Sequence, residues 1–273
     1  MKKKIVLMLT VIMLIGLAGC GKNQINIKET GTSDNNEQMV QNIYENKRTE
    51  VKQKISEIKE RLPETSAEDK GTCGSKAKWY YKDNTLIIYG EGVITEDTWH
   101  KSNIVINTVV IDSGITKLGN NMFSGLGSEV GKNIENFYIA DGLEEIGSST
   151  FVNCDCLSEI VLPPSLYFID GYTFASCDSL KKIYMTDGVE KIGDSAFTGC
   201  KSLDSIFIPK TVLAIGNGVF TGCNNLSDIQ ISKDNRIFSE KNNCIINNDT
   251  KTLIYAINKD FSIPDDILCI AED

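Results

Sequence analysis

A 23-residue repeat constrains the fold of this chain more than any other feature of its sequence. Four blocks of this length run without a gap from Ile134 to Asn225, and each carries apolar residues at the same five positions. The columns are Phe137, Ile160, Ile183 and Ile206; Ile139, Leu162, Met185 and Ile208; Leu143, Leu166, Val189 and Val212; Ile146, Ile169, Ile192 and Ile215; and Phe151, Phe174, Phe197 and Phe220. One block cannot bury its own apolar side, so neighbouring copies must stack and share one core.

Each block is predicted to form one turn of a solenoid. The apolar residues before each turn alternate, which favours a short strand, and successive copies would form a parallel sheet with ~4.8 Å between strands. Glycine follows the inward isoleucine at 147, 193 and 216, while Asp170 and Gly171 take that place in the remaining block. These residues suit a tight or left-handed turn. The phenylalanine column would close the far wall, and an earlier block ending at Phe123 fits the same columns.

The segment 71–103, before the repeats, is predicted to be an N-terminal cap. Two apolar strands, Trp79–Tyr81 and Thr85–Tyr89, flank Asp83 and Asn84, which suit a hairpin turn. A solenoid needs such a cap because its first coil would otherwise expose the core.

The repeats themselves are assigned to residues 104–273, with an insertion at about 236–258. Within the insertion, Cys244–Ile246 and Thr252–Tyr255 bracket a polar segment and predict a second hairpin. The repeat pattern resumes at Phe261.

The N-terminus, residues 1–19, has the pattern of an export signal. Three lysines precede an apolar run from Ile5 to Leu17, which is short for a membrane span. The sequence Leu-Ala-Gly-Cys that follows resembles the lipobox of bacterial lipoproteins, which implies that Cys20 receives a diacylglycerol on its sulfur and becomes the new N-terminus. The protein would then be lipid-anchored to the cell membrane and face its extracytoplasmic or extracellular side. The alternative is an ordinary signal peptide followed by a chance cysteine.

Residues 20–70 are predicted to be a lipid-anchored leash followed by a helical spacer. The polar sequence to about Asn36 indicates a flexible leash. Farther on, Val51, Ile55, Ile58 and Leu62 share one face of a helix that Pro63 would end. This helix is either a solvated spacer that packs lightly on the domain or a coiled-coil seam for self-association.

The repeat resembles the BspA-type, or Treponema-like, leucine-rich repeat over about residues 104–273. The block LDSIFIPKTVLAIGNGVFTGCNN at 203–225 follows that family's pattern most closely, and Gly71–Gly92 is similar to a cysteine-containing hairpin that often precedes such repeats in exported clostridial-type proteins. The expected fold is a leucine-rich-repeat solenoid with a short parallel sheet and an irregular, turn-rich opposite face, preceded by a capping β-hairpin and a spacer helix. The resemblance also implies adhesion or host interaction.

Cysteine and histidine chemistry is not indicated. Cys154, Cys177, Cys200 and Cys223 recur every 23 residues, which favours small side chains packed between coils over disulfides or a metal. A disulfide among Cys73, Cys156, Cys244 and Cys269 is open in an oxidising location. His100 is the only histidine and has no nucleophile at a recognisable spacing.

The sequence also argues against an enzyme and against nucleic-acid binding. It contains no P-loop, GxSxG, HExxH or dinucleotide-binding motif, so we expect no catalysis, no cofactor and no metal. The net charge is −9, and removal of a signal peptide with three lysines and no acid makes it −12. A polyanion is therefore an unfavourable partner.

The candidate ligand-binding site is the outward column of the strands, here called the stripe. Apolar and aromatic side chains on a solvent face suggest a contact surface, although such residues also simply favour strands. The stripe consists of Val110, Tyr138, Val161, Tyr184, Phe207 and Gln230.

The predicted function is that of a cell-surface lipoprotein that binds an extracellular protein or glycan. Two alternatives remain open. The first is an envelope scaffold that binds the producer's own cell wall or partner proteins. The second is a repeat appendage of an enzyme-bearing protein.

Overall fold

The computed structural model describes residues 33–99, 104–125, 129–257 and 262–271. The chain divides into two compact units, residues 1–36 and 37–273, and the fold below is that of the second. The signal peptide, the lipid-attachment residue Cys20 and His100 lie outside the described residues. None of the helices in the described ranges combines the length and the hydrophobicity that a bilayer crossing requires.

The predicted N-terminal hairpin is confirmed. Its last strand pairs with the first strand of each of the two rows of parallel strands that form the solenoid. Its strands are β1 (Asp69–Thr72), β2 (Lys76–Lys82) and β3 (Thr85–Ile94), all antiparallel. At the β2–β3 turn, Asp83 and Asn84 have φ of 48° and 56°, as a two-residue hairpin turn requires. The first part of β3 pairs in parallel with β4 and its last residues pair with β5. These partners are β4 (Thr108–Ile111) and β5 (Ile115–Leu118).

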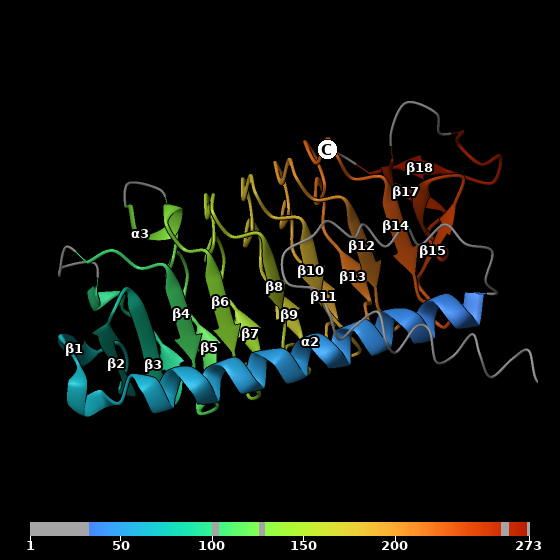
Figure 1. Cartoon of the computed structure of the whole chain (residues 1–273). Coiled ribbons are helices and arrows are strands. Elements are labelled where there is room, and N and C mark those ends of the chain that lie inside the picture. Colours follow the sequence, from blue (N-terminus) through green and yellow to red (C-terminus); the bar gives the residue numbers. More distant parts are fainter. Residues whose placement is uncertain (1–32, 100–103, 126–128, 258–261, 272–273) are drawn as a thin grey trace, which may run out of the picture. The chain divides into compact units, whose positions relative to one another are not determined.

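Each repeat then contributes two short strands, one to each of two ladders (Figure 1). The front strands pair in parallel as β4–β6, β8–β10 and β12–β14, and in the last two pairs residues 23 apart lie opposite one another, for example Ile160 and Ile183. The back strands also pair in parallel, from β5 through to β13. The front strands after β4 are β6 (Asn136–Ile139), β8 (Glu159–Val161), β10 (Lys182–Tyr184), β12 (Ser205–Ile208) and β14 (Asp228–Ile231). The back strands after β5 are β7 (Glu145–Ile146), β9 (Phe168–Ile169), β11 (Lys191–Ile192) and β13 (Ala214–Ile215).

The solenoid is therefore confirmed, and its opposite side is more regular than predicted. The two-residue back strands escaped prediction because a strand this short has no alternation of its own. Between β5 and β6 the longer connection contains the short helix α3 (Glu129–Lys132). A 3-10 turn, η1 (Glu64–Ser66), joins helix α2 (Ser33–Arg61) to β1.

The phenylalanine column forms a continuous aromatic stack through the core. Adjacent rings from Phe123 to Phe220 have centroids 5.0–5.9 Å apart and are nearly parallel, and all are fully buried. Trp99 from the cap segment stacks on Phe123 at one end, and Tyr255 from the insertion packs on Phe220 at the other. The aromatic stack thus extends beyond the repeats into both flanking segments.

The glycines at 147, 193 and 216 do not have the left-handed conformation, which was one of the two alternatives that the sequence suggested. None of the three has a positive φ. Instead, a Cβ at Gly193 would lie 2.6 Å from the nitrogen of Gly171, and one at Gly216 would lie 2.5 Å from the nitrogen of Asp194. Successive coils therefore approach too closely for a side chain at Gly193 and Gly216, whereas the equivalent position of the second coil holds Asp170.

A left-handed residue lies two positions later in each coil. Asn121, Ser149, Tyr172, Ser195 and Gly218 occupy equivalent positions and have φ between 54° and 60°. A second column with positive φ follows at Asn153, Ser176, Gly199 and Gly222. An aromatic residue is poorly suited to this conformation because its Cβ crowds the following carbonyl oxygen.

We expect Tyr172→Gly to stabilise the protein. Tyr172 is half exposed and has a φ of 57°, so relief of about 1–2 kcal/mol of strain should exceed the entropy of about 0.5–1 kcal/mol that glycine loses on folding. Urea unfolding should therefore show a small gain. The matched control is Tyr167→Gly, where an exposed tyrosine without a positive φ is replaced and stability should fall. Equal losses for both variants would contradict the prediction.

The insertion forms three antiparallel strands at the end of the solenoid. The predicted hairpin is present as the β16–β17 pair, and an additional strand, β15, precedes it. The last strand, β18, pairs in parallel with β17. Their bounds are β15 (Phe238–Lys241), β16 (Cys244–Asn247), β17 (Thr252–Ala256) and β18 (Cys269–Ile270).

Candidate functional site

The stripe is not an exposed surface, because a helix of the same chain covers part of it. Helix α2 (Ser33–Arg61) begins earlier than predicted, and its residues from Glu37 onward run across the front strands (Figure 1). Val110 and Val161 are buried, whereas Tyr138, Tyr184, Phe207 and Gln230 are half-buried. The expectation of exposure was therefore wrong for this face. A ligand could bind the whole stripe only by displacing the helix.

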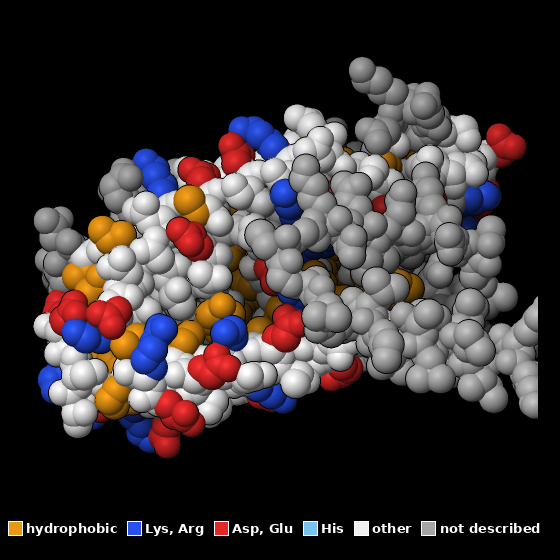
Figure 2. Space-filling view, in the orientation of Figure 1, with side chains coloured by type: hydrophobic (Ala, Val, Ile, Leu, Met, Phe, Trp, Pro, Cys, Tyr) orange, Lys and Arg blue, Asp and Glu red, His pale blue; other side chains and the backbone are white. Residues whose placement is uncertain are grey.

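The apolar face of α2 makes this contact. Tyr44, Val51, Ile55, Ile58 and Leu62 form one buried cluster with the front face. The residues of the front face and cap in this cluster are Tyr80, Ile87, Val110 and Val161, with Tyr138 and Tyr184 at its margin. In Figure 2, hydrophobic side chains gather along the seam between the helix and the sheet. The predicted helical face is thus correct, but α2 packs on the sheet instead of serving as a solvated spacer.

Buried hydrogen bonds fix the register of α2 on the sheet. The Tyr44 hydroxyl donates to the carbonyl of Leu162 at 2.8 Å. The Arg48 guanidinium, 3% exposed, donates to the carbonyl of Ile139 at 2.9 Å and to the carboxylate of Asp141 at 2.6 Å. Because the front strands offer these carbonyls at their ends, α2 binds backbone as well as side chains.

Ion pairs add further contacts along the helix. Near its C-terminal end, Lys59 pairs with Asp112 at 2.5 Å. In the middle of the helix, Lys47 pairs with Glu159 at 2.8 Å and lies 5.6 Å from the centre of the Tyr184 ring. These contacts are more exposed and contribute less than the buried hydrogen bonds.

The packing of α2 on the front strands depends on pH through the carboxyl of Asp141. Partial burial alone would raise the pKa of this carboxyl, but hydrogen bonds from Lys52 and Arg48 hold the pKa below its ordinary value. A lowered pKa in the folded state means that the stabilisation is present above pH ~4, the ordinary aspartate value. It is lost as the pH falls through the folded-state pKa.

The cysteine column is structural. Cys154, Cys177, Cys200 and Cys223 are buried, and each thiol donates to the carbonyl of a phenylalanine in the preceding coil, for example Cys177 to Phe151 at 2.9 Å. Burial raises the pKa of the Cys177 thiol well above its ordinary value. A protonated, enclosed thiol is a weak nucleophile and a poor metal ligand.

The other described cysteines are also free thiols, so the structure does not pair Cys73, Cys156, Cys244 and Cys269. Among the residues that the structure describes, no group of three or more histidine, cysteine or acidic side chains could hold a metal ion.

We expect thiol reagents to distinguish the two exposed cysteines from the four buried cysteines of the column. In the folded protein, Cys156 and Cys269 are exposed and should react within minutes with a maleimide, whereas the four column thiols should remain unmodified even at pH 9. Peptide mapping by mass spectrometry checks this. Rapid labelling of Cys177 without denaturant would show that the coils do not pack as described.

The back face carries a second outward column, which we call the back column. It consists of Glu144, Tyr167, Glu190, Leu213 and Arg236, all exposed and 23 residues apart. Their backbones are joined by hydrogen bonds from Tyr167 to Glu144, from Glu190 to Tyr167 and from Leu213 to Glu190. Sequence reasoning missed this column because its acidic, aromatic, aliphatic and basic residues share no common property.

The back column changes character along the solenoid. At its first end, Glu145 beside it accepts hydrogen bonds from Lys117 at 2.6 Å and from Tyr167 at 2.5 Å. In the middle, Lys191 lies 5.0 Å from the centre of the Phe168 ring. At its last end, Leu213 is 58% exposed, which is high for a large apolar side chain.

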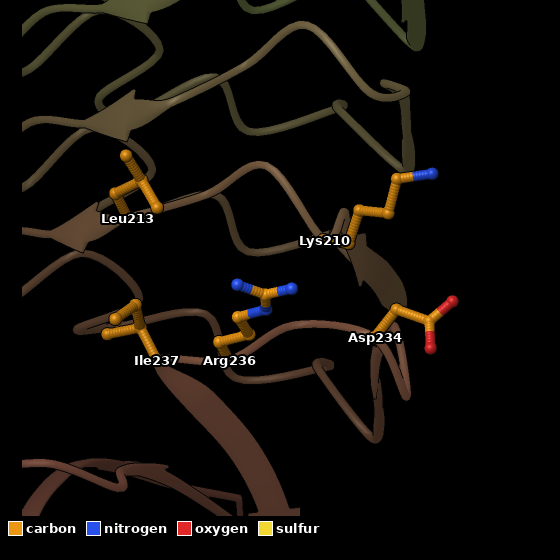
Figure 3. A pocket seen from close by; sticks show the side chains of 5 residues that line it. All are labelled: Lys210, Leu213, Asp234, Arg236 and Ile237. Carbon is orange, nitrogen blue, oxygen red and sulfur yellow. The ribbon is translucent and has the colours of Figure 1, made fainter.

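A shallow hollow of about 410 Å³ lies at this last end (Figure 3). Leu213 and Ile237 line one side, Lys210 and Asp234 the other, and Arg236 lies between the two pairs. Lys210 also pairs with Asp187 at 2.7 Å. The hollow thus combines an aliphatic wall with a guanidinium group.

Stacked coils of 23 residues with a shared apolar core define a leucine-rich-repeat solenoid. Residues 129–249 match the family described as the BspA type leucine rich repeat region, in six copies. This part of the chain is therefore a BspA-type leucine-rich repeat region, and the resemblance seen in the sequence is confirmed there.

Solved structures share this fold. A leucine-rich repeat protein from Eubacterium ventriosum is 24% identical with a TM-score of 0.65, and the match covers 74% of this chain and 55% of that one. The pneumococcal vaccine antigen PcpA is 17% identical with a TM-score of 0.55, covering 75% of this chain and 61% of that one. A leucine rich cell surface protein from Faecalibacterium prausnitzii is 19% identical with a TM-score of 0.50, covering 76% and 73%. A comparison with curated proteins found no match.

These likenesses establish the fold alone. The match spans little more than half the length of the first two proteins.

Proposed function

We propose that this protein is a cell-surface lipoprotein whose solenoid binds an extracellular protein or glycan. The observation that carries the proposal is the back face, where an exposed leucine and an arginine border a hollow. Leucine-rich-repeat solenoids are typically non-catalytic binding proteins, and they bind through extended surfaces formed by successive coils. Two of the similar structures are named as a cell surface protein and a vaccine antigen, which favours the same location.

Binding is tested with the purified full chain against immobilised host matrix proteins, host glycans and the producer's own cell wall. We expect saturable binding to a host protein or glycan. A chain that binds only the wall would support an envelope scaffold instead. Absence of binding to all three would overturn the proposal.

The lipid anchor is tested separately through Cys20. In cells fed an alkyne-labelled fatty acid, the wild-type chain should acquire the label and fractionate with membranes. Cys20→Ala should lose both properties. Retention of label by the variant would reject Cys20 as the lipid-attachment residue.

A further inference from the structure

We propose that the hollow at Arg236 binds an acidic side chain of a protein partner, with a neighbouring apolar residue of that partner packed on Leu213 and Ile237. This inference rests on the proposed function and specifies its ligand. It concerns the back face alone and requires no movement of α2.

The charge at the hollow argues for a carboxylate. Arg236 has no hydrogen-bond or ion-pair partner within the described residues, whereas the chain's buried arginine, Arg48, has two. Lys210 at the rim is paired with Asp187, and Asp234 is the single acid lining the hollow, so Arg236 is the lining cation without a partner among the described residues. A guanidinium presents a planar fork of donors that matches a carboxylate with two parallel hydrogen bonds. The net charge of −9 repels an acidic ligand from the surface as a whole, so binding at this end depends on the guanidinium of Arg236.

The shape and lining argue for a peptide over a sugar. The apolar part of the lining consists of Leu213 and Ile237, which are aliphatic. Sugars commonly stack on aromatic rings, and the aromatic residue of the back column, Tyr167, lies two coils away from Leu213. An aliphatic wall beside a guanidinium instead suits an apolar side chain next to an aspartate or glutamate.

The arginine content of the chain makes a direct test practicable. The sequence contains three arginines, Arg48, Arg61 and Arg236, so their side-chain Nε–H signals can be resolved by NMR. The probe is the peptide acetyl-Leu-Glu-Leu-amide, titrated into the full chain beside acetyl-Leu-Gln-Leu-amide and free glucuronate. We expect the Arg236 signal to shift with the glutamate peptide and the Arg48 signal to stay in place.

Variants then locate the site. Arg236→Ala should lower the affinity for the glutamate peptide about tenfold, the usual consequence of losing a hydrogen bond to a charged group, and Arg236→Lys should recover part of it. Lys191→Ala is the matched control, because it removes one positive charge from the same face outside the hollow. Thermal unfolding of Arg236→Ala should be unchanged because the side chain is exposed.

Three outcomes would overturn the inference. An equal response to the glutamine peptide would exclude carboxylate recognition, and an equal loss in Lys191→Ala would indicate general attraction to the face. A larger shift with glucuronate than with the peptide would make the ligand a sugar acid. Because the broader proposal is tested by whole-protein binding, it can stand when this one fails.

Discussion

Replacement of Phe174 by alanine should lower the free energy of unfolding by about 3–5 kcal/mol. Phe174 is fully buried in the middle of the aromatic stack, 5.0 Å from Phe151 and 5.6 Å from Phe197 between ring centroids. Its removal leaves a cavity that the coils cannot close, because backbone hydrogen bonds such as Phe174 N–H to the Ala196 carbonyl fix their spacing at this point. Urea unfolding measures the loss.

The substitution also tests whether the column acts as one unit. Phe174→Leu should lower the free energy of unfolding by less than Phe174→Ala does, since leucine retains most of the buried apolar volume. Tyr167→Ala changes an exposed aromatic residue on the other side of β9, and it should lower the free energy of unfolding by less than about 1 kcal/mol. A loss of under 1 kcal/mol for Phe174→Ala would show that the stack does not hold neighbouring coils together.

The sequence predicts the solenoid well because every coil repeats the same physical problem. A residue such as Ile160 is buried between its counterparts in adjacent coils, so its type recurs every 23 residues and its position can be read directly. The hairpin at Asp83 and Asn84 is predictable for a different reason, because few residues tolerate a positive φ. Both signals are local or periodic.

The contact between α2 and the stripe has no local or periodic signal in the sequence. The spacing of Val51, Ile55 and Ile58 indicates an apolar helical face, but it does not indicate which surface that face packs against. The decisive hydrogen bonds join Tyr44 and Arg48 to backbone carbonyls, which carry no side-chain identity. An apolar helix and an apolar stripe in one chain could have suggested the pairing, since each needs a partner.

The hollow could have been partly predicted from spacing. Arg236 lies 23 residues after Leu213 and so belongs to the same outward column. The break in the repeat pattern instead places Arg236 in the insertion, whose strand β15 begins two residues later. The hollow is also lined by Lys210 and Asp234, which lie outside the back column, so the 23-residue spacing alone does not predict them.

Introduction of a charge beneath α2 should release the helix and leave the solenoid folded. Val51 is 5% exposed in the cluster that contains Val110 and Val161, and Val51→Asp would place a carboxylate there without a partner. This should destabilise docking by about 3 kcal/mol. Amide exchange over residues 37–61 should then accelerate about hundredfold, while Phe174 and its neighbours stay protected. Gln53→Asp, on the exposed side of the same helix, is the matched control.

Acid should have the same effect on the wild-type chain. Because hydrogen bonds lower the pKa of Asp141 in the folded state, the contact begins to weaken below the ordinary aspartate value of about 4. It is lost as the pH falls through the lower folded-state pKa, where protonation removes the attraction for Arg48 and leaves that guanidinium buried with less compensation. Exchange over residues 37–61 should therefore rise in acid before the solenoid unfolds, and Asp141→Asn should show the faster exchange already at neutral pH. Equal protection of α2 at pH 3 and pH 7 would show that this ion pair does not hold the helix.

The released state also decides what the stripe can do. If the stripe binds a ligand once uncovered, Val51→Asp should bind an extracellular partner more tightly than the wild type, and a further Tyr184→Ser change should reverse the gain. If α2 is a permanent part of the core, the same variant should instead self-associate through the exposed apolar face and gain no ligand. The two outcomes separate a helix that regulates access from one that completes the fold, because only the first predicts a gain in binding that depends on Tyr184.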